Sequence, residues 1–295
     1  MSRTIGVLAT HAIQVGLVED NQLAAPALVY PGDKLGELDL KVVPVEELLG
    51  RVVDMVAEAL GDATIDAVGA GFPGIVRNGV IEESPNLLQL KGLRARDELT
   101  IALRARHIDA PVLVMNDADA LAAGVAATRG YLEKLIRVWY LGDGIGFGRY
   151  PHVEGVWEAG HTVVSLDPKE RFCGCGGTGH LEGIMGHRAM RLRFLDLEPE
   201  EVFAAAREGD TRCADFVRRW HRALAAATAT SIHLEGPGKF FIAGPSAQFV
   251  DVSYLSSILH DMVKMTPLQG SMYEVVSAGN DVALVGAGVS AARPG

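Results

Sequence analysis

Cysteine is scarce in this chain, which has three cysteines among 295 residues. Two of them, Cys173 and Cys175, lie two positions apart, where a disulfide bond would be strained. The sequence therefore predicts no disulfide framework and is typical of a protein from a reducing compartment, the cytoplasm. The third, Cys213, falls in a helical pattern with Phe216 and Trp220, and we expect a buried thiol there.

Positive charge is also in short supply, with 27 Lys and Arg against 37 Asp and Glu and a formal net charge of −10. Because nucleic-acid binding needs clustered Lys and Arg to neutralise phosphates, we expect no nucleic-acid partner. No apolar run is long enough to span a membrane, so we expect no membrane partner either. Polar Thr10, His11 and Gln14 interrupt the first apolar stretch, and this beginning is not typical of a signal peptide.

Hydrophobic residues make up 48% of the chain, and 34 glycines provide for many tight turns. Apolar runs of strand length alternate with segments of helical periodicity, which is typical of an α/β protein. Strands are predicted at 4–19 (as a strand–turn–strand), 66–71, 75–81, 111–115, 137–141, 240–243 and 274–276. Helices are predicted at 44–60, 93–107, 118–129, 183–194, 198–208, 211–233, 255–265 and 282–292. The length suits one large domain or two ordinary ones.

The stretch from Glu158 to Glu182 concentrates residue types that bind metal ions. Two thiolates and two imidazole nitrogens make a complete tetrahedral set for a structural zinc ion. Glycines at four positions between residues 174 and 179 allow the backbone to fold tightly around such an ion. We therefore predict a structural zinc site with the ligands His161, Cys173, Cys175 and His180. The alternative is a glycine-rich loop that holds two cysteines by chance.

Two further motifs each allow two interpretations from the residues alone. Residues 69–74 match the GxGxxG pattern of dinucleotide-binding proteins, but the segment after them resembles a hairpin with an Asn78-Gly79 turn rather than the required helix. Asn116 and Asp117 follow a predicted strand and open a predicted helix. An aspartate in this place is either a helix N-cap or a catalytic carboxylate.

The metal-binding stretch also carries a family resemblance. Glu158-Ala-Gly-His161, followed by Cys173-x-Cys175-Gly-x-x-Gly-His180-x-Glu182, resembles the paired signature of the ROK family of sugar kinases and sugar-responsive repressors, ExGH and then CxCGxxGCxE. His180 stands where the family has its third cysteine, and histidine is also a good zinc ligand. The resemblance implies that Glu158 and Glu182 bind sugar hydroxyls. It also implies that His161 holds the zinc through one ring nitrogen and touches the sugar through the other.

The segment Asn116-Asp117-Ala118-Asp119 resembles the NDAN motif of the same family. The resemblance implies that Asp117 is the general base that accepts a proton from the sugar hydroxyl, and that Asn116 fixes the same hydroxyl. Such a base is needed because a sugar hydroxyl is a poor nucleophile. Gly74, in a Gly-Phe-Pro-Gly segment, resembles the family residues beside the sugar pocket.

Two glycine segments resemble the family's nucleotide loops. Residues 142–148, GDGIGFG, resemble the phosphate loop GTGIGGG, with Asp143 in place of threonine and Phe147 in place of glycine. Residues 242–246 resemble the adenosine-side loop, with Pro245 in place of a glycine. The family's first phosphate loop, DxGGTK, is replaced by VLATHA at residues 7–12. A carboxylate beside a triphosphate repels it unless magnesium lies between them. The nucleotide-binding residues implied are Gly142, Asp143, Gly144, Gly146 and Gly244.

The resemblance covers nearly the whole chain and implies two actin-like (ribonuclease H-like) α/β domains, 1–115 and a larger 116–295 with the zinc, around an active-site cleft. It further implies a homodimer. No DNA-binding segment precedes the first predicted strand, so we do not expect a repressor of the usual family type. The predicted function is an ATP-dependent hexose kinase with a structural zinc, magnesium and weakened ATP binding. Two alternatives stay open: a non-catalytic, sensor-like sugar-binding protein, and a zinc-stabilised structural protein without a ligand.

Overall fold

The computed structural model describes residues 2–32, 39–155 and 158–293, which belong to two compact units. The first unit comprises residues 1–136, 148–157 and 278–295, and the second comprises residues 137–147 and 158–277. The predicted boundary after Met115 differs from this division. The helix after Met115 and the last helix of the chain both pack on the first sheet and therefore belong to the first unit.

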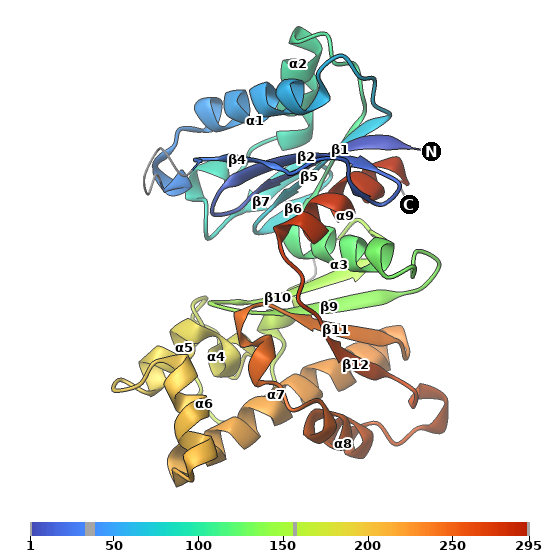
Figure 1. Ribbon diagram of the computed structural model, residues 1–295. Helices are drawn as coiled ribbons and strands as arrows, with labels where there is room; N and C mark the ends of the chain where they lie inside the picture. Colours follow the sequence, from blue (N-terminus) through green and yellow to red (C-terminus); the bar gives the residue numbers. More distant parts are fainter. Residues whose placement is uncertain (1, 33–38, 156–157, 294–295) are drawn as a thin grey trace. The chain divides into compact units, whose positions relative to one another are not determined.

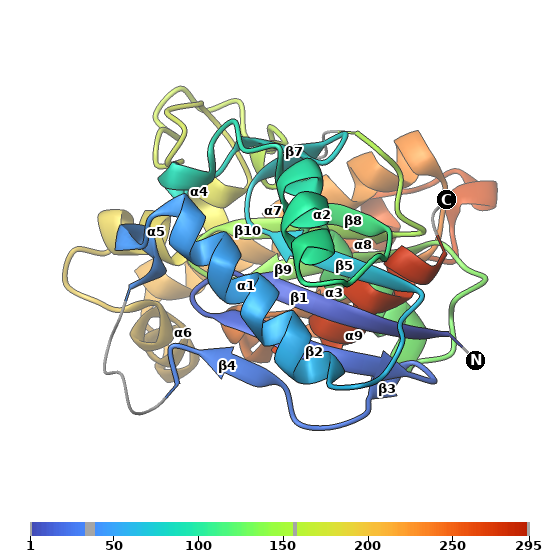
Figure 2. The same cartoon turned by 90° about the horizontal axis from the view of Figure 1, so that it is seen from above.

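The first unit is built on a sheet with the strand order β3-β2-β1-β5-β8, with β4 also paired to β2. Strand β1 runs antiparallel to β2 and parallel to β5, and β5 runs parallel to β8. Helices α1 and α2 lie on one face, as Figures 1 and 2 show, and α3 and α9 lie on the other. The elements are β1 (Arg3–Ala9), β2 (Ile13–Glu19), β3 (Gln22–Leu23), β4 (Leu28–Tyr30), α1 (Val45–Leu60), β5 (Ala67–Phe72), α2 (Ala95–Ala105), β8 (Val112–Asn116), α3 (Asp117–Thr128) and α9 (Asn280–Ala292).

The segment after Gly74 forms the antiparallel hairpin of β6 (Ile75–Arg77) and β7 (Val80–Glu83). Asn78 and Gly79 form its turn, with φ angles of 53° and 78°. Two successive residues at positive φ are typical of the tight turns that suit the twist of a hairpin. No helix opens at Gly74, so the GxGxxG pattern of residues 69–74 is not a dinucleotide-binding motif.

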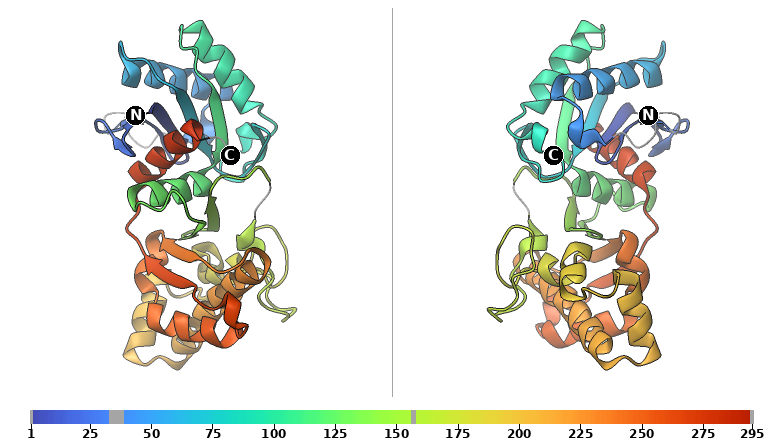
Figure 3. Two further views of the ribbon diagram at one scale, coloured as in Figure 1. Left: turned by 90° about the vertical axis from the view of Figure 1, so that its right-hand side faces the viewer. Right: turned by 90° about the vertical axis from the view of Figure 1, so that its left-hand side faces the viewer.

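Helices α3 and α9 approach each other and the sheet closely because glycines face their neighbours' backbones. A Cβ atom on Gly286 of α9 would lie 1.8 Å from the carbonyl oxygen of Ala120 in α3. A Cβ atom on Gly69 of β5 would lie 1.9 Å from the carbonyl oxygen of Ala287. The two helices lie side by side in both views of Figure 3. This packing fixes the start of α3, where Asp117 stands.

The second unit is built on a sheet with the strand order β10-β9-β11-β12. Its core contains the fully buried Trp139 and Trp220, and Trp139 Nε1 donates a 3.0 Å hydrogen bond to Thr228 Oγ1. That bond joins strand β9 to the long helix α7 (Figure 1). The elements are β9 (Ile136–Leu141), β10 (Ile145–Tyr150), α4 (Glu182–Met185), α5 (His187–Arg193), α6 (Pro199–Glu208), α7 (Thr211–Glu235), β11 (Lys239–Ala243), α8 (Val252–Met262) and β12 (Met272–Val275). Residues 148–150 at the end of β10 belong to the first unit.

Most predicted elements are confirmed, but two predictions for the second unit were wrong in extent. The helix predicted at 183–194 is two helices, because Gly186 adopts an extended conformation (ψ 143°) between α4 and α5. The glycine loop predicted at 142–148 is shorter, since β10 begins at Ile145. Short 3₁₀ segments complete the described chain: η2 (Leu40–Val42), η3 (Leu88–Leu90), η4 (Ala159–His161), η5 (Pro245–Phe249) and η6 (Thr266–Leu268).

Among the described residues, no helix combines the length and the apolar character needed to cross a bilayer. The longest, α7, has 25 residues, and its first half carries several charged side chains.

The glycine packing of α9 leads to a prediction for stability. Gly286→Ala should lower the free energy of unfolding by about 1 to 3 kcal/mol, the usual cost of overpacking, because the new methyl group meets the backbone of α3. Gly50→Ala in α1 is the matched control, since a Cβ atom there meets nothing within 4 Å. That change should stabilise the protein by up to about 1 kcal/mol through helix propensity alone. Urea unfolding of both variants measures the difference, and equal effects would contradict the packing argument.

Candidate functional site

Backbone pairing at the two ends of a long loop in the second unit brings His161 next to His180. Val163 and His180 form an antiparallel bridge, Val164 N–H donates to Gly179 O (2.8 Å), and Leu181 N–H donates to Thr162 O (2.9 Å). Gly179 has a φ of 75°, and a Cβ atom on it would lie 1.9 Å from the carbonyl oxygen of Ser165. A residue with a side chain would therefore prevent this closure.

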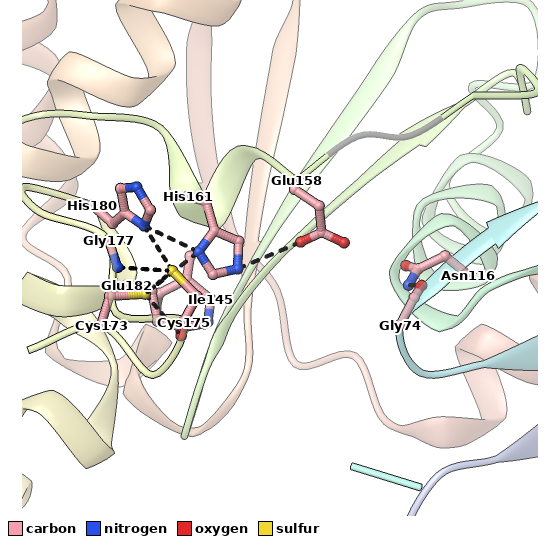
Figure 4. A network of polar contacts seen from close by, with 10 residues as sticks. All are labelled: Gly74, Asn116, Ile145, Glu158, His161, Cys173, Cys175, Gly177, His180 and Glu182. Atoms are coloured by element: carbon pink, nitrogen blue, oxygen red, sulfur yellow. Dashed lines mark hydrogen bonds and ion pairs between the residues drawn. The ribbon is translucent and has the colours of Figure 1, made fainter. Parts of the chain in front are cut away.

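The four predicted zinc ligands lie together, with donor atoms within 4.8 Å of one another. Figure 4 shows both thiols and both imidazoles turned toward one point. The His161 and His180 Nδ1 atoms are 3.2 Å apart, and the Cys173 and Cys175 Sγ atoms are 3.4 Å apart. Cys175 Sγ lies 3.2 Å from His180 Nδ1, and Cys173 Sγ lies 3.4 Å from His161 Nδ1. A tetrahedron with ordinary Zn–N and Zn–S bonds has edges of about 3.3 to 3.8 Å, and these four separations lie close to that range.

The protonation of the ligands also fits a metal ion. Burial raises the pKa of the Cys173 thiol to about 12, and a bound cation would favour the thiolate that binds metals. Burial and the neighbouring His161 lower the pKa of His180, which favours the neutral imidazole that binds metals. The two thiols and two imidazoles thus fit a zinc ion in a closed structural site.

A buried ion pair holds this loop to the helices behind it. The Glu170 carboxylate is 5% exposed and accepts hydrogen bonds from Arg193 Nη2 (2.6 Å) and Nη1 (3.2 Å), and it also pairs with Arg219. Burial alone would raise the pKa of Glu170, but the hydrogen bonds from Arg193 and Arg219 outweigh it and leave that pKa below its ordinary value. Gly179 N–H donates to Glu170 O (2.7 Å), so the pair anchors the loop near His180.

His161 joins the metal ligands to Glu158. Its Nδ1 atom faces the other ligands, while its Nε2 atom lies 3.8 Å from Glu158 Oε2 (Figure 4). Burial and the neighbouring Glu182 raise the pKa of Glu158, although His161 partly offsets them. Glu182 accepts a hydrogen bond from Ile145 N–H (3.1 Å) and lies 3.5 Å from Cys173 Sγ. Two predicted sugar-binding residues of the second unit, Glu158 and Glu182, therefore each lie beside a predicted zinc ligand, and the third, His161, is itself one.

In the first unit, Asn116 is the residue that caps helix α3. Its Oδ1 atom accepts from Ala118 N–H (2.8 Å), and its Nδ2 atom donates to Gly74 O (2.7 Å). Gly74 has a φ of 105°, and a Cβ atom on it would meet the carbonyl oxygen of Glu83 at 2.1 Å. The cap thus falls one residue before Asp117, which is half-buried as the first residue of α3. These contacts bring the predicted residues Gly74, Asn116 and Asp117 together.

A second acidic group, which was not singled out from the sequence, lies one step further into α3. Asp119 is 7% exposed and accepts a hydrogen bond from Arg149 N–H (2.9 Å), and its Oδ2 atom is 3.9 Å from His152 Nδ1. Burial raises the pKa of Asp119 from 3.8 to about 7, against the lowering effect of that hydrogen bond. The only sequence signal was an aspartate where the NDAN motif has its final asparagine.

Most of the predicted nucleotide-binding residues lie in two turns of the second unit. Gly142, Asp143 and Gly144 form the β9–β10 turn, whereas Gly146 lies within strand β10. Gly244, at a φ of 94°, ends β11. Gly142 N–H already donates to Gly144 O (3.1 Å), and Ile145 N–H donates to Glu182. In the described structure of this turn, these two N–H groups are therefore engaged by the chain's own acceptors.

The zinc site can be tested by removing one ligand. Cys175→Ala should abolish stoichiometric zinc and lower the melting temperature, because the binding energy of a structural metal is also folding energy. Cys213→Ala is the control, since Cys213 is a buried core thiol of α7 and should leave the zinc content unchanged. Metal analysis of the purified proteins and thermal unfolding are the measurements. Pure wild-type protein without zinc would contradict the assignment.

Asp119 leads to a prediction about pH. The folded protein keeps a proton on Asp119 that the unfolded chain releases, so the free energy of unfolding should fall as the pH rises from about 4 to about 7. Asp119→Asn keeps the acceptor for Arg149 N–H and removes the titration. Between pH 4 and pH 7 the variant should therefore lose less unfolding free energy than the wild-type protein, by an amount on the order of a few kcal/mol. Urea unfolding across this range measures it, and an unchanged slope would show that Asp119 titrates normally.

Comparisons with known proteins place these features in a wider context. The glucokinase of Pyrobaculum calidifontis is 29% identical over 250 residues, which cover 79% of this chain and 80% of that protein. The glucokinase of Thermotoga maritima is 31% identical over 232 residues, which cover 68% of this chain and 70% of that protein. The crystal structure of a ROK hexokinase from Thermus thermophilus covers 98% of both chains with a TM-score of 0.76 and 22% identity.

The likeness to the Thermus structure confirms the predicted fold class, an α/β protein with two actin-like domains. The ROK family model matches residues 40–292, which include every predicted zinc, sugar and nucleotide residue. Together with the relative that is 31% identical, this match shows that the chain belongs to the ROK family.

Proposed function

We propose that this protein is an ATP-dependent hexose kinase that transfers a phosphoryl group to glucose or a closely related sugar. The observation that carries the proposal is the double role of His161, which turns Nδ1 to the metal ligands and Nε2 to Glu158. A residue held in this way presents a fixed polar edge to a ligand. Both curated relatives described above are glucokinases, which supports the same substrate class.

The sugar is held in this proposal by side chains that can accept its hydroxyl hydrogens. Glu158 and Glu182 accept from sugar hydroxyls, and His161 Nε2 makes a third contact. Asn116 also contacts the reacting hydroxyl. Asp117 accepts the proton of that hydroxyl as the phosphoryl group arrives, which increases its nucleophilicity. Zinc, when bound, contributes folding energy and fixes the direction of His161.

The phosphate donor is bound, in this proposal, at the two glycine turns of the second unit, with magnesium neutralising phosphate charge. We further propose that ATP binds more weakly than in ordinary hexose kinases. The turn between β1 and β2 supports this, because Thr10 N–H donates to Ala12 O (3.2 Å) and the segment 7–12 offers no glycine. Pro245 also lacks an N–H donor beside Gly244. The cytoplasmic location and the homodimer stay predictions from the sequence.

A coupled assay with ATP and a panel of hexoses tests the proposal, run beside calorimetric titration of the same sugars. Asp117→Asn should lower kcat by about 100-fold or more, the usual contribution of a general base, and change sugar affinity much less. Asp54→Asn on the exposed face of α1 is the control and should keep full activity.

Three outcomes of this assay contradict parts of the proposal. Sugar binding without phosphorylation by the wild-type protein would favour the non-catalytic, sensor-like alternative. Absence of binding for every hexose at millimolar concentrations would show that the assigned sugar residues are wrong. A wild-type kcat of tens per second with a low ATP KM would contradict the weakened donor site.

A further inference from the structure

Three segments of the second unit pack into one small structure around the glycine turns. They are the β9–β10 turn at Gly142–Gly144, the α4–α5 junction at Gly186, and the β11–η5 turn at Gly244. His187 N–H donates to Gly142 O (3.0 Å). A Cβ atom on Gly186 would lie 2.7 Å from Asp143 O, and one on Gly244 would lie 2.6 Å from Leu141 O. Movement of one segment therefore disturbs the others.

His187 connects the two glycine turns through its side chain. Its Nε2 atom lies 2.6 Å from Ser246 Oγ, and its Nδ1 atom lies 3.7 Å from Asp143 Oδ1. His187 and Ser246 are 7% and 1% exposed. Because the carboxylate faces Nδ1, it favours the tautomer with hydrogen on Nδ1, and the Ser246 hydroxyl then donates to Nε2. The buried hydroxyl and imidazole thus satisfy each other, and Asp143 favours the arrangement in which the hydroxyl is the donor.

The charge of Asp143 faces a cation of helix α5. Arg191 Nη1 lies 3.4 Å from Asp143 Oδ1, and Arg191 Nε donates a 2.7 Å hydrogen bond to Glu198 Oε2. Glu198 is the N-cap of α6, so this arginine spans from the glycine turn to the next helix. Although the Asp143 side chain is 79% exposed, its negative charge is not isolated.

We propose that Asp143, Arg191, His187 and Ser246 form a positioning network that fixes the two glycine turns of the donor site. Asp143 acts through Arg191 and His187, and it neither anchors magnesium nor only repels phosphate. This inference rests on the proposed function, which places the phosphate donor at these turns. It explains how the chain accommodates an aspartate where the family's phosphate loop has threonine.

The three roles for Asp143 predict different effects of Asp143→Thr on nucleotide binding. A positioning role lowers the affinity for ATP about threefold to tenfold, the effect of losing one or two polar contacts, both with magnesium and in excess EDTA. A magnesium anchor lowers the affinity only when magnesium is present. A repelling carboxylate gives the opposite sign, since its removal raises the affinity, and does so most in EDTA.

The experiment is calorimetric titration of the full-length, zinc-loaded protein with ATP, with and without magnesium. Asp261→Thr in α8 is the matched control, because Asp261 has the same 79% exposure and is also ion-paired, with Lys264. It should leave ATP affinity unchanged. A double-mutant cycle of Asp143→Thr with Ser246→Ala should be non-additive, because both changes act on His187. Thermal unfolding and zinc content check that each variant is folded.

Kinetics then separate this inference from the proposed function. Where hexoses are phosphorylated, Asp143→Thr should raise the ATP KM while kcat and the sugar KM change little. If Asp143→Thr lowers ATP affinity as predicted but the wild-type protein phosphorylates no hexose, the network is supported and the kinase proposal is refuted. An affinity loss that depends on magnesium, an affinity gain, an additive cycle, or no ATP binding by the wild-type protein would overturn the network.

Discussion

The closure of residues 161–180 around four metal-binding side chains is the constraint on which the candidate site depends. Two thiols and two imidazoles converge because the ends of the loop pair through Val163 and His180. A loop of this length that lacks regular structure has little cohesion of its own, and in the proposed zinc site a cation would replace the hydrophobic core that the loop does not have. The buried Glu170 with Arg193 adds a second attachment to the helices behind it. The direction of His161 toward Glu158 follows from this closure.

The proposed role of Asp117 depends on backbone packing rather than on a metal ion. Asp117 stands at the first position of α3, and glycines that touch neighbouring backbones pack this helix against α9. Asn116 fixes the same point through its cap and its bond to Gly74. A helix that cannot shift holds its first residue in one place, which suits a general base that works within hydrogen-bond reach of a hydroxyl.

The two glycine turns of the proposed donor site show how a departure from a family pattern can be absorbed locally. An aspartate introduced into a phosphate-binding turn would be unfavourable if it stood alone. Here Arg191 faces its charge, and His187 connects it to a buried hydroxyl in the neighbouring turn. Such a substitution is better understood from its surroundings than from its residue type.

The sequence alone determined the α/β class, most elements, the four side chains that form the metal-binding cluster, and the family membership suggested by the ExGH and CxCG motifs. These features depend on local periodicity and on donor atoms at fixed spacing, and both can be read directly from the sequence. The break at Gly186 was not predicted, although glycine is a poor helix former, because its extended conformation accompanies close packing against the Asp143 carbonyl oxygen. The burial of Asp119, the bond between His187 and Ser246 and the pairing of Asp143 with Arg191 were likewise decided by the tertiary structure. The two contacts join residues from separate elements, and the burial of Asp119 depends on what covers its side chain. The spacing of residues in a motif indicates neither kind of feature.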